Sequence, residues 1–207
     1  MSYLIIVLTS LISIQAFRNP EWFSRLQFNA YQIYHRREYH RLLTHGFLHA
    51  NWTHLIVNML VLFFFGPYAE RQLRVILPQD MQHFSPLVFL LFYLAAVVMA
   101  SSITVFKQKD NAWYNAVGAS GAVSAIIFFF IFFNPWELIY FYGILPIPGV
   151  IMGALYLIYS QVMIRRGTDN VNHDAHFVGA VFGFLFPLLI NVKLILVFLD
   201  RLMSFSF

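Results

Sequence analysis

The sequence contains no cysteine and few charged residues. The absence of cysteine excludes disulfide bonds, thiolate catalysis and cysteine-ligated metal centres. Only 11% of the residues are charged, whereas an average soluble domain has about 25%. A clustered basic tract of the kind that nucleic-acid binding requires is also lacking. With 60% hydrophobic residues, the chain is predicted to be an integral, multi-pass membrane protein surrounded by the lipid bilayer, with no nucleic-acid partner.

Apolar stretches predict six transmembrane helices in a single domain, residues 1–207. No Lys or Arg precedes the first stretch, so we interpret it as a spanning helix, with a cleaved signal peptide as the alternative. Residues 18–51 are rich in arginine and aromatic side chains, which favours an interfacial segment. Residues 136–148 form an aromatic connection interrupted by Pro146 and Pro148. The predicted helices cover 3–17, 52–67, 86–106, 119–133, 149–164 and 175–199.

The fourth predicted helix is too short to cross a bilayer. At 1.5 Å per residue, residues 119–133 extend about 22 Å, whereas the hydrocarbon core is about 30 Å thick. One end of this helix should therefore lie below the membrane surface, and water would reach it through a cavity.

Polar residues from three distant stretches should meet on one side of the membrane. The second, fourth and sixth helices run in the same direction, so their N-terminal ends share one face. These ends carry His54 with Asn58, Ser120, and His176 respectively. Polar side chains in a membrane span are costly and indicate function.

The chemistry that these residues allow is nucleophilic catalysis. Serine needs a base to remove its proton, and histidine is the usual base near neutral pH. His176, Gly179 and Gly183 lie on one helical stripe, and glycines on that face permit close approach of a neighbouring helix. If the neighbour is the fourth helix, His176 is carried to Ser120; the alternative is a plain packing motif with an incidental histidine.

His54 and Asn58 lie four residues apart and share a helix face. Both can donate hydrogen bonds to a developing oxyanion, as can the backbone N–H of Ser120. The alternative is that both serve only as polar contacts between helices.

Two other chemistries are less well supported. No carboxylate falls inside the apolar runs, and Asp174 is two residues from His176 and so on a different side of a helix. A Ser-His dyad is therefore simpler than a triad. His45 with His49, or His173 with His176, could ligate a metal, but the glutamate of a zinc-type H-E-x-x-H motif is missing. We expect no metal and no cofactor, with a membrane metal oxidase as the alternative.

These motifs together resemble the rhomboid intramembrane serine proteases. Gly118-Ala119-Ser120-Gly121 is similar to their G-x-S-G element, and Ala175-His176 followed by Gly179 and Gly183 to their A-H-x-x-G-x-x-x-G element. The stretch 41–49 with His54 and Asn58 is similar to their first loop and second helix, and residues 140–149 to a connection in bacterial members. The resemblance follows nearly the whole chain in the right order.

The resemblance implies an all-α, six-helix bundle that cleaves single-span membrane proteins in or near their transmembrane segments. It implies Ser120 as nucleophile, His176 as base and acid, His54 and Asn58 at the oxyanion, and Gly118, Gly121, Gly179 and Gly183 as supporting residues. It makes Glu70 structural, and a bacterial inner membrane the expected location. A catalytically inactive relative that only binds membrane helices is the alternative.

Two features depart from the family pattern. Many relatives have an aromatic residue four positions after the serine, stacked on the catalytic histidine, where this chain has Ser124. Another group, a water molecule or the Ser124 hydroxyl would then orient His176. The loops on the serine side carry nine of the 13 Lys and Arg residues, which by the positive-inside rule places that side in the cytoplasm. The family opens outward, and we follow the family here.

Overall fold

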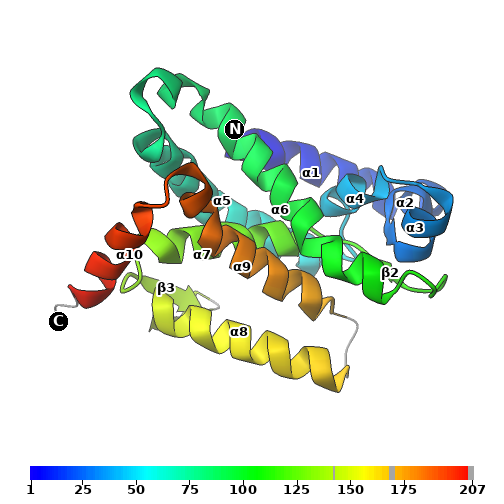
Figure 1. Ribbon diagram of the computed structural model, residues 1–207. Helices are drawn as coiled ribbons and strands as arrows, with labels where there is room; N and C mark the ends of the chain where they lie inside the picture. The colour runs from blue at the N-terminus through cyan, green and yellow to red at the C-terminus, as the bar shows by residue number, and fades with distance from the viewer. Residues whose placement is uncertain (142, 168–170, 205–207) are drawn as a thin grey trace.

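The computed structural model describes residues 1–141, 143–167 and 171–204. It is a bundle of long helices that alternate in direction along the chain (Figure 1). The central helix, α7, contacts α5, α6, α8 and α9. The long helices are α1 (Ser2–Phe17), α5 (Trp52–Ile76), α6 (Ser85–Lys107), α7 (Ser120–Phe133), α8 (Gly149–Arg166) and α9 (His173–Ile190).

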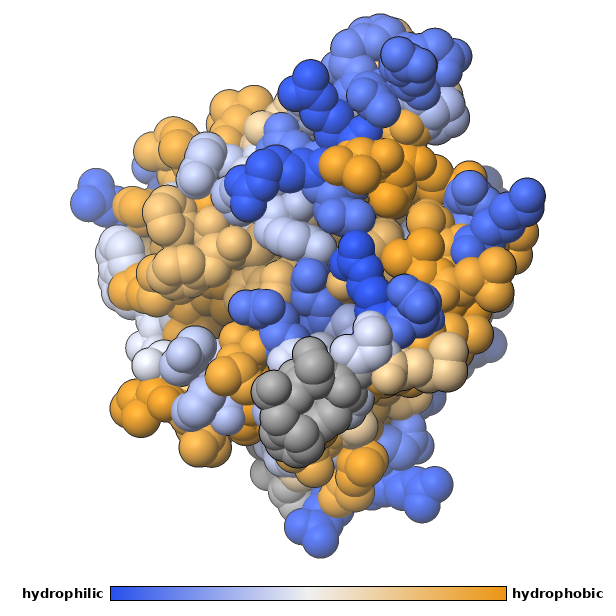
Figure 2. All heavy atoms as spheres, turned by 90° about the vertical axis from the view of Figure 1, so that its left-hand side faces the viewer, coloured by the Kyte–Doolittle hydropathy of each residue, from blue (hydrophilic) through white to orange (hydrophobic). Residues whose placement is uncertain are grey.

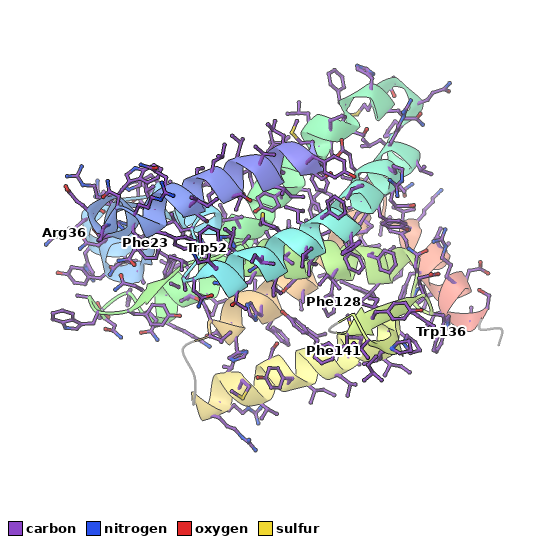
Figure 3. The ribbon with its side chains drawn as sticks, turned by 180° about the vertical axis from the view of Figure 1, so that it is seen from behind. Phe23, Arg36, Trp52, Phe128, Trp136 and Phe141 are labelled. Carbon is purple, nitrogen blue, oxygen red and sulfur yellow. The ribbon has the colours of Figure 1, made fainter. Side chains whose placement is uncertain are left out.

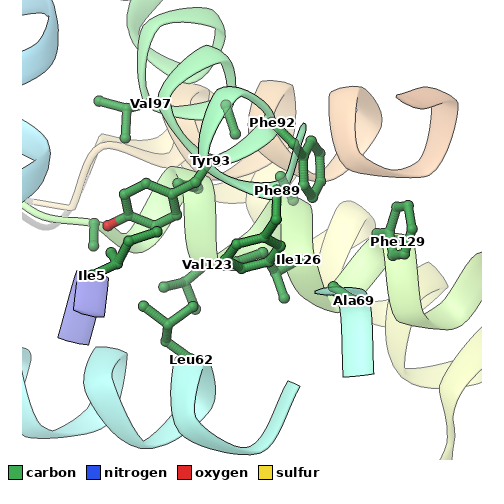
Figure 4. Close-up of a cluster of buried hydrophobic side chains, with 14 of the residues drawn as sticks. Ile5, Leu62, Ala69, Phe89, Phe92, Tyr93, Val97, Val123, Ile126 and Phe129 are labelled. Atoms are coloured by element: carbon green, nitrogen blue, oxygen red, sulfur yellow. The ribbon is translucent and has the colours of Figure 1, made fainter. Parts of the chain in front are cut away.

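The hydrophobic core is formed around α7 by side chains from the neighbouring helices (Figure 4). Phe89 and Tyr93 of α6 and Leu62 of α5 are fully buried against Ile126 of α7. Outside this core, large apolar side chains cover the helix surfaces, as expected of a protein that faces lipid. Examples are Leu4, Ile56, Phe64, Leu91, Leu155 and Leu189.

In the part of the chain that the structure describes, three helical segments are long and apolar enough to cross a membrane: Trp52–Ile76, Gln79–Lys107 and His173–Ile190. The helices α1 and α7 are apolar but shorter. Figure 3 shows Phe23, Arg36 and Trp52 at one end of the bundle and Trp136 with Phe141 at the other. Aromatic side chains at both ends are typical of the two membrane–water interfaces. The end away from Ser120 presents polar residues among apolar ones (Figure 2).

Four predicted helices agree with α1, α6, α7 and α8 to within two residues, but the second prediction, 52–67, was wrong. Helix α5 continues through Pro67 to Ile76. Proline removes one backbone hydrogen bond, and the next turns compensate by burying Ala69 and Leu73. Glu70 on this extension accepts the backbone N–H of Ser2 at 3.1 Å and so binds the start of α1.

The sixth prediction, one helix over 175–199, was also wrong. Helix α9 ends at Ile190 because Asn191 adopts an extended conformation, and its side chain accepts the N–H of Lys193. A separate helix, α10 (Leu194–Met203), then folds across the C-terminal end of α7. There the Arg201 guanidinium donates to the Phe133 carbonyl.

The segment between α1 and α5 consists of short elements. They are α2 (Pro20–Leu26), β1 (Phe28–Asn29), α3 (Ala30–Arg36), α4 (Arg41–Thr44) and the 3-10 turn η1 (His45–Phe47). Buried Arg41 ties them together by donating to the Ser24 and Gln27 carbonyls, each at 2.8 Å. Strand β1 pairs with β2 (Asn115–Ala116), which leads into α7. This pairing fixes the first loop against the segment that carries Ser120.

The aromatic connection before α8 is a β-hairpin rather than an irregular loop. Strand β3 (Leu138–Phe141) pairs antiparallel with β4 (Leu145–Pro148). Pro146 and Pro148 do not prevent this, because proline is accepted in edge strands. A further 3-10 turn, η2 (Gln79–Phe84), precedes α6.

Candidate active site

Ser120 is the first residue of α7 and follows a tightly held turn. Gly118 has φ +126°, a conformation that side-chain-bearing residues rarely adopt. Its N–H donates to the His45 carbonyl at 3.0 Å. The first N–H groups of a helix have no acceptor within that helix, so the backbone N–H of Ser120 has no acceptor within α7.

The hydroxyl of Ser120 meets the imidazole of His176. Ser120 Oγ and His176 Nε2 lie 2.8 Å apart, and both residues are partly buried. This is the nucleophile–base geometry of serine hydrolases. It brings together two residues separated by 56 positions in the sequence.

Glycines on α9 make this contact possible. A Cβ added at Gly179 would overlap the Gly121 carbonyl, and one at Gly183 would overlap the Ala125 carbonyl. The backbones of α7 and α9 therefore touch directly, as the sequence predicts if the neighbour of the sixth helix is the fourth.

His54 lies against the Ser120 turn. A Cβ added at Gly118 would come within 2.6 Å of His54 Cε1, so the imidazole occupies the space that a side chain would need. Asn58, one turn further along α5, is buried. Its Nδ2 donates to the His54 carbonyl at 2.8 Å, which uses one of two amide hydrogens.

His49 supports the same turn from the first loop. Its Nε2 lies 3.5 Å from the Ala119 N, and its Nδ1 lies 2.9 Å from Ser13 Oγ. Ser13 Oγ also donates its single hydrogen to the Phe47 carbonyl. His49 Nδ1 must therefore carry the proton that is donated to Ser13, and Nε2 is the acceptor.

Burial lowers the pKa of both first-loop histidines. It lowers the pKa of His45 to about 4, although the Leu42 carbonyl opposes the shift. It lowers the pKa of His49 to about 3, with the nearby His54 as a second cause. Both rings are therefore neutral near pH 7 and act as structural supports.

The structure also shows where the other candidate ligands and carboxylates lie. The His173 and His176 rings meet edge to face at 5.9 Å. Asp174 accepts a bond from Lys107 at 2.7 Å. Within the described ranges, no three His, Asp or Glu side chains gather in a way that could hold a metal ion.

Tyr156 of α8 is a site residue that the sequence reasoning missed. Its ring stacks on His176, with centroids 6.2 Å apart and planes inclined by 24°. Its hydroxyl lies 2.5 Å from Ser124 Oγ, and Ser124 Oγ donates to the Ser120 carbonyl at 2.8 Å. A signal existed: Gly149, Gly153, Tyr156 and Ser160 follow one stripe of α8, whose glycines contact α7.

A cavity of about 20 Å³ lies beside Ser120. That is room for about one water molecule. Its lining includes Val97, Ala100, Ser101, Gly118, Gly121 and Ala175. A water held there would lie beside Ser120.

Comparison with known proteins identifies the family. The model of the Rhomboid domain matches residues 36–193, which include Ser120, His176, His54 and Asn58. The chain belongs to the rhomboid family. It is 29% identical over 156 residues to "RHOMBOID-like protein 12, mitochondrial" of Arabidopsis thaliana, covering 68% of this chain and 43% of that protein.

Two further relatives show the range of this rhomboid family. "Putative rhomboid protease YdcA" of Bacillus subtilis (strain 168) is 28% identical over 152 residues, covering 73% of this chain and 67% of that protein. "Rhomboid-like protein 14, mitochondrial" of Arabidopsis thaliana is 24% identical over 169 residues, covering 79% and 47%. The chain thus spans less than half the length of the two plant relatives.

Proposed function

We propose that this protein is an intramembrane serine endopeptidase that uses a Ser120–His176 dyad. The observation that carries the proposal is the 2.8 Å contact between Ser120 Oγ and His176 Nε2, formed where α7 and α9 meet. Membership of a family whose relatives include a putative protease supports the same reaction class. In this proposal the long helices form a six-span bundle in a bacterial cell membrane. The bacterial location is proposed because residues 140–149 resemble a connection in bacterial members of the family.

The chemistry begins with proton transfer from Ser120 Oγ to His176 Nε2. The oxygen then attacks the substrate carbonyl carbon, and the negative charge that develops on the carbonyl oxygen is bound by hydrogen-bond donors. We assign this role to the Ser120 N–H, the His54 imidazole and the free amide hydrogen of Asn58. His176 next protonates the leaving amine as the C–N bond breaks.

The resulting acyl-enzyme is resolved by water. His176 takes a proton from a water molecule, whose oxygen attacks the acyl carbon and releases the carboxylic acid and the Ser120 hydroxyl. The cavity beside Ser120 has room for that water. Asp174 is not the third member of a triad in this scheme, because it is bound to Lys107.

The substrate class is the one that membership of the rhomboid family implies. Substrates are transmembrane segments of single-span membrane proteins. Backbone carbonyls in such a helix are already hydrogen-bonded, so a helix that unwinds readily, with glycine, proline or small polar residues near the cut, is the better substrate.

The test is cleavage of a single-span substrate in detergent together with labelling by a fluorophosphonate probe. Ser120→Ala and His176→Ala should each lower cleavage by about 10⁴-fold or more, and Ser120→Ala should abolish labelling. Ser102→Ala is the matched control, because the Ser102 hydroxyl is bound to the Met99 carbonyl of its own helix. Cleavage retained by Ser120→Ala would falsify the serine mechanism.

An inactive, helix-binding rhomboid relative is the second candidate. It is favoured by the plant relatives, whose names call them rhomboid-like and do not call them proteases. Wild-type protein that binds a substrate helix but neither cleaves it nor reacts with the probe would establish this alternative.

A further inference from the structure

Tyr156 links α8 to both halves of the catalytic dyad. Its ring stacks on the His176 imidazole, with the ring centroids 6.2 Å apart and the ring planes inclined by 24°. Its hydroxyl lies 2.5 Å from Ser124 Oγ, one helical turn after Ser120. Figure 1 shows α8 alongside α9 at the edge of the bundle, so this tyrosine reaches inward from an outer helix.

The hydrogen bonds at Ser124 have a defined direction. The Ser120 carbonyl can only accept, and it accepts from Ser124 Oγ at 2.8 Å. Ser124 has one hydroxyl hydrogen, so the bond to Tyr156 forms at the same time only when the tyrosine donates. The chain therefore runs from the Tyr156 O–H to the Ser124 O–H and on to the Ser120 carbonyl. This chain anchors the tyrosine ring to the helix that carries the nucleophile.

Aromatic rings pack around the His176 imidazole. Asp174 binds Lys107, and the group that faces the imidazole edge-on is the His173 ring at 5.9 Å. Offset-stacked rings at this separation attract each other. A ring on the imidazole face therefore limits rotation of His176 away from Ser120 Oγ.

We propose that Tyr156 is a positioning residue that holds His176 in line with Ser120 and is itself held by Ser124. The inference rests on the proposed protease function. It explains how His176 is oriented although position 124 carries serine instead of an aromatic residue. The aromatic ring comes from α8, and the Ser124 hydroxyl holds that ring in place.

The test compares Tyr156→Leu, which removes the ring, with Tyr156→Phe, which keeps it. Cleavage is measured per active site, titrated with the fluorophosphonate probe, so that a smaller folded fraction does not affect the rate. Tyr156→Leu should lower kcat by about 10-fold to 100-fold, because small misplacements of a catalytic group are costly, with KM within about twofold. Tyr156→Phe should keep most of the rate.

Tyr159→Leu is the matched control. Tyr159 lies on the same helix, is 54% exposed, and contacts His173 instead of His176. Removing its ring should leave kcat within about twofold of wild type, the variation expected for a residue outside the reacting groups.

A double-mutant cycle tests the hydroxyl bond. Tyr156→Phe and Ser124→Ala each remove the same bond, so the double variant should be no slower than the slower single variant. Multiplicative losses would contradict the shared bond. Unchanged kcat in Tyr156→Leu would overturn the positioning role, as would equal losses in the Leu and Phe variants. Failure of the protease proposal would give a different result, because the Ser120→Ala variant would then still cleave the substrate.

Discussion

At the scale of single residues, position 118 requires glycine for two reasons, its backbone conformation and its contact with His54. Its φ of +126° favours glycine, and the His54 ring fills the space of a side chain. Gly118→Ala should therefore strain the turn and displace His54. Under the proposed mechanism, in which His54 binds the oxyanion, we expect a fall in kcat/KM of about 10² to 10³, the cost of losing one such donor.

Gly143→Ala provides a control for backbone strain alone. Gly143 also has a positive φ, +73°, but nothing lies within 4 Å of an added Cβ. Cleavage assays and thermal unfolding of the two variants in detergent separate the effects. Equal losses of activity in both would contradict a specific contact between Gly118 and His54.

The buried histidines of the first loop predict acid sensitivity. An unfolded chain binds a proton at each histidine near pH 6.5, whereas burial lowers the folded-state pKa of His45 to about 4 and of His49 to about 3. Because the unfolded state binds more protons between these values, stability is complete above about pH 6.5 and declines as the pH falls towards 4 and 3.

The measurement is the free energy of unfolding in detergent as a function of pH. His45→Gln should flatten the dependence between pH 6.5 and 4, whatever its effect on stability at pH 7.5. His83→Gln, at an exposed position in η2, is the control for replacing a histidine outside the first loop. If His45→Gln kept the wild-type slope, His45 would be ruled out as a source of the pH dependence of the unfolding free energy.

At the scale of elements, the contact between α7 and α9 determines whether the dyad forms. Gly183→Ala places a methyl group against the Ala125 carbonyl, so the helices must separate. We expect a loss of about 1–3 kcal/mol of stability, the usual cost of overpacking, together with reduced cleavage because His176 moves with α9.

Gly153→Ala on α8 is the comparison for this prediction. A Cβ there would meet only side-chain ends, the nearest being Ile131 Cδ1 at 3.2 Å, which can move. Thermal unfolding and cleavage should both be close to wild type. If Gly183→Ala were equally well tolerated, the close approach of α7 and α9 would not be required for activity.

The same elements show what the sequence alone could predict. Helices α1, α6, α7 and α8 follow from apolar runs bounded by polar or proline residues, and the convergence of Ser120 with His176 follows from helix count and direction. The extension of α5 past Pro67 could not be predicted from the sequence, because it depends on Glu70 binding the start of α1. The glycine stripe of α8 indicates that Tyr156 faces α7, but its contact with His176 also depends on how α8 crosses α9, which local patterns do not encode.

At the scale of the whole molecule, the bundle has two distinct ends. One carries β2 and the starts of α7 and α9, which hold Ser120 and His176, and the other carries α10, the hairpin and the start of α1 (Figure 1). Six crossings would place these ends on opposite sides of a membrane. Among the described residues, three helical segments are long and apolar enough by themselves to cross, so α1, α7 and α8 would cross only as parts of the bundle.

Cysteine labelling can test this arrangement directly, because the chain has no cysteine of its own. Trp113→Cys lies at the Ser120 end, where the side chain is 91% exposed, and Met203→Cys lies at the other end, where it is 78% exposed. With the family's orientation, a membrane-impermeant thiol reagent should label Cys at 113 in sealed cells and Cys at 203 only after permeabilisation. The reverse pattern would mean that the Lys and Arg of the serine-side loops set the orientation. Labelling of both from the same side would contradict the six-span arrangement, since an odd number of crossings must separate the two positions.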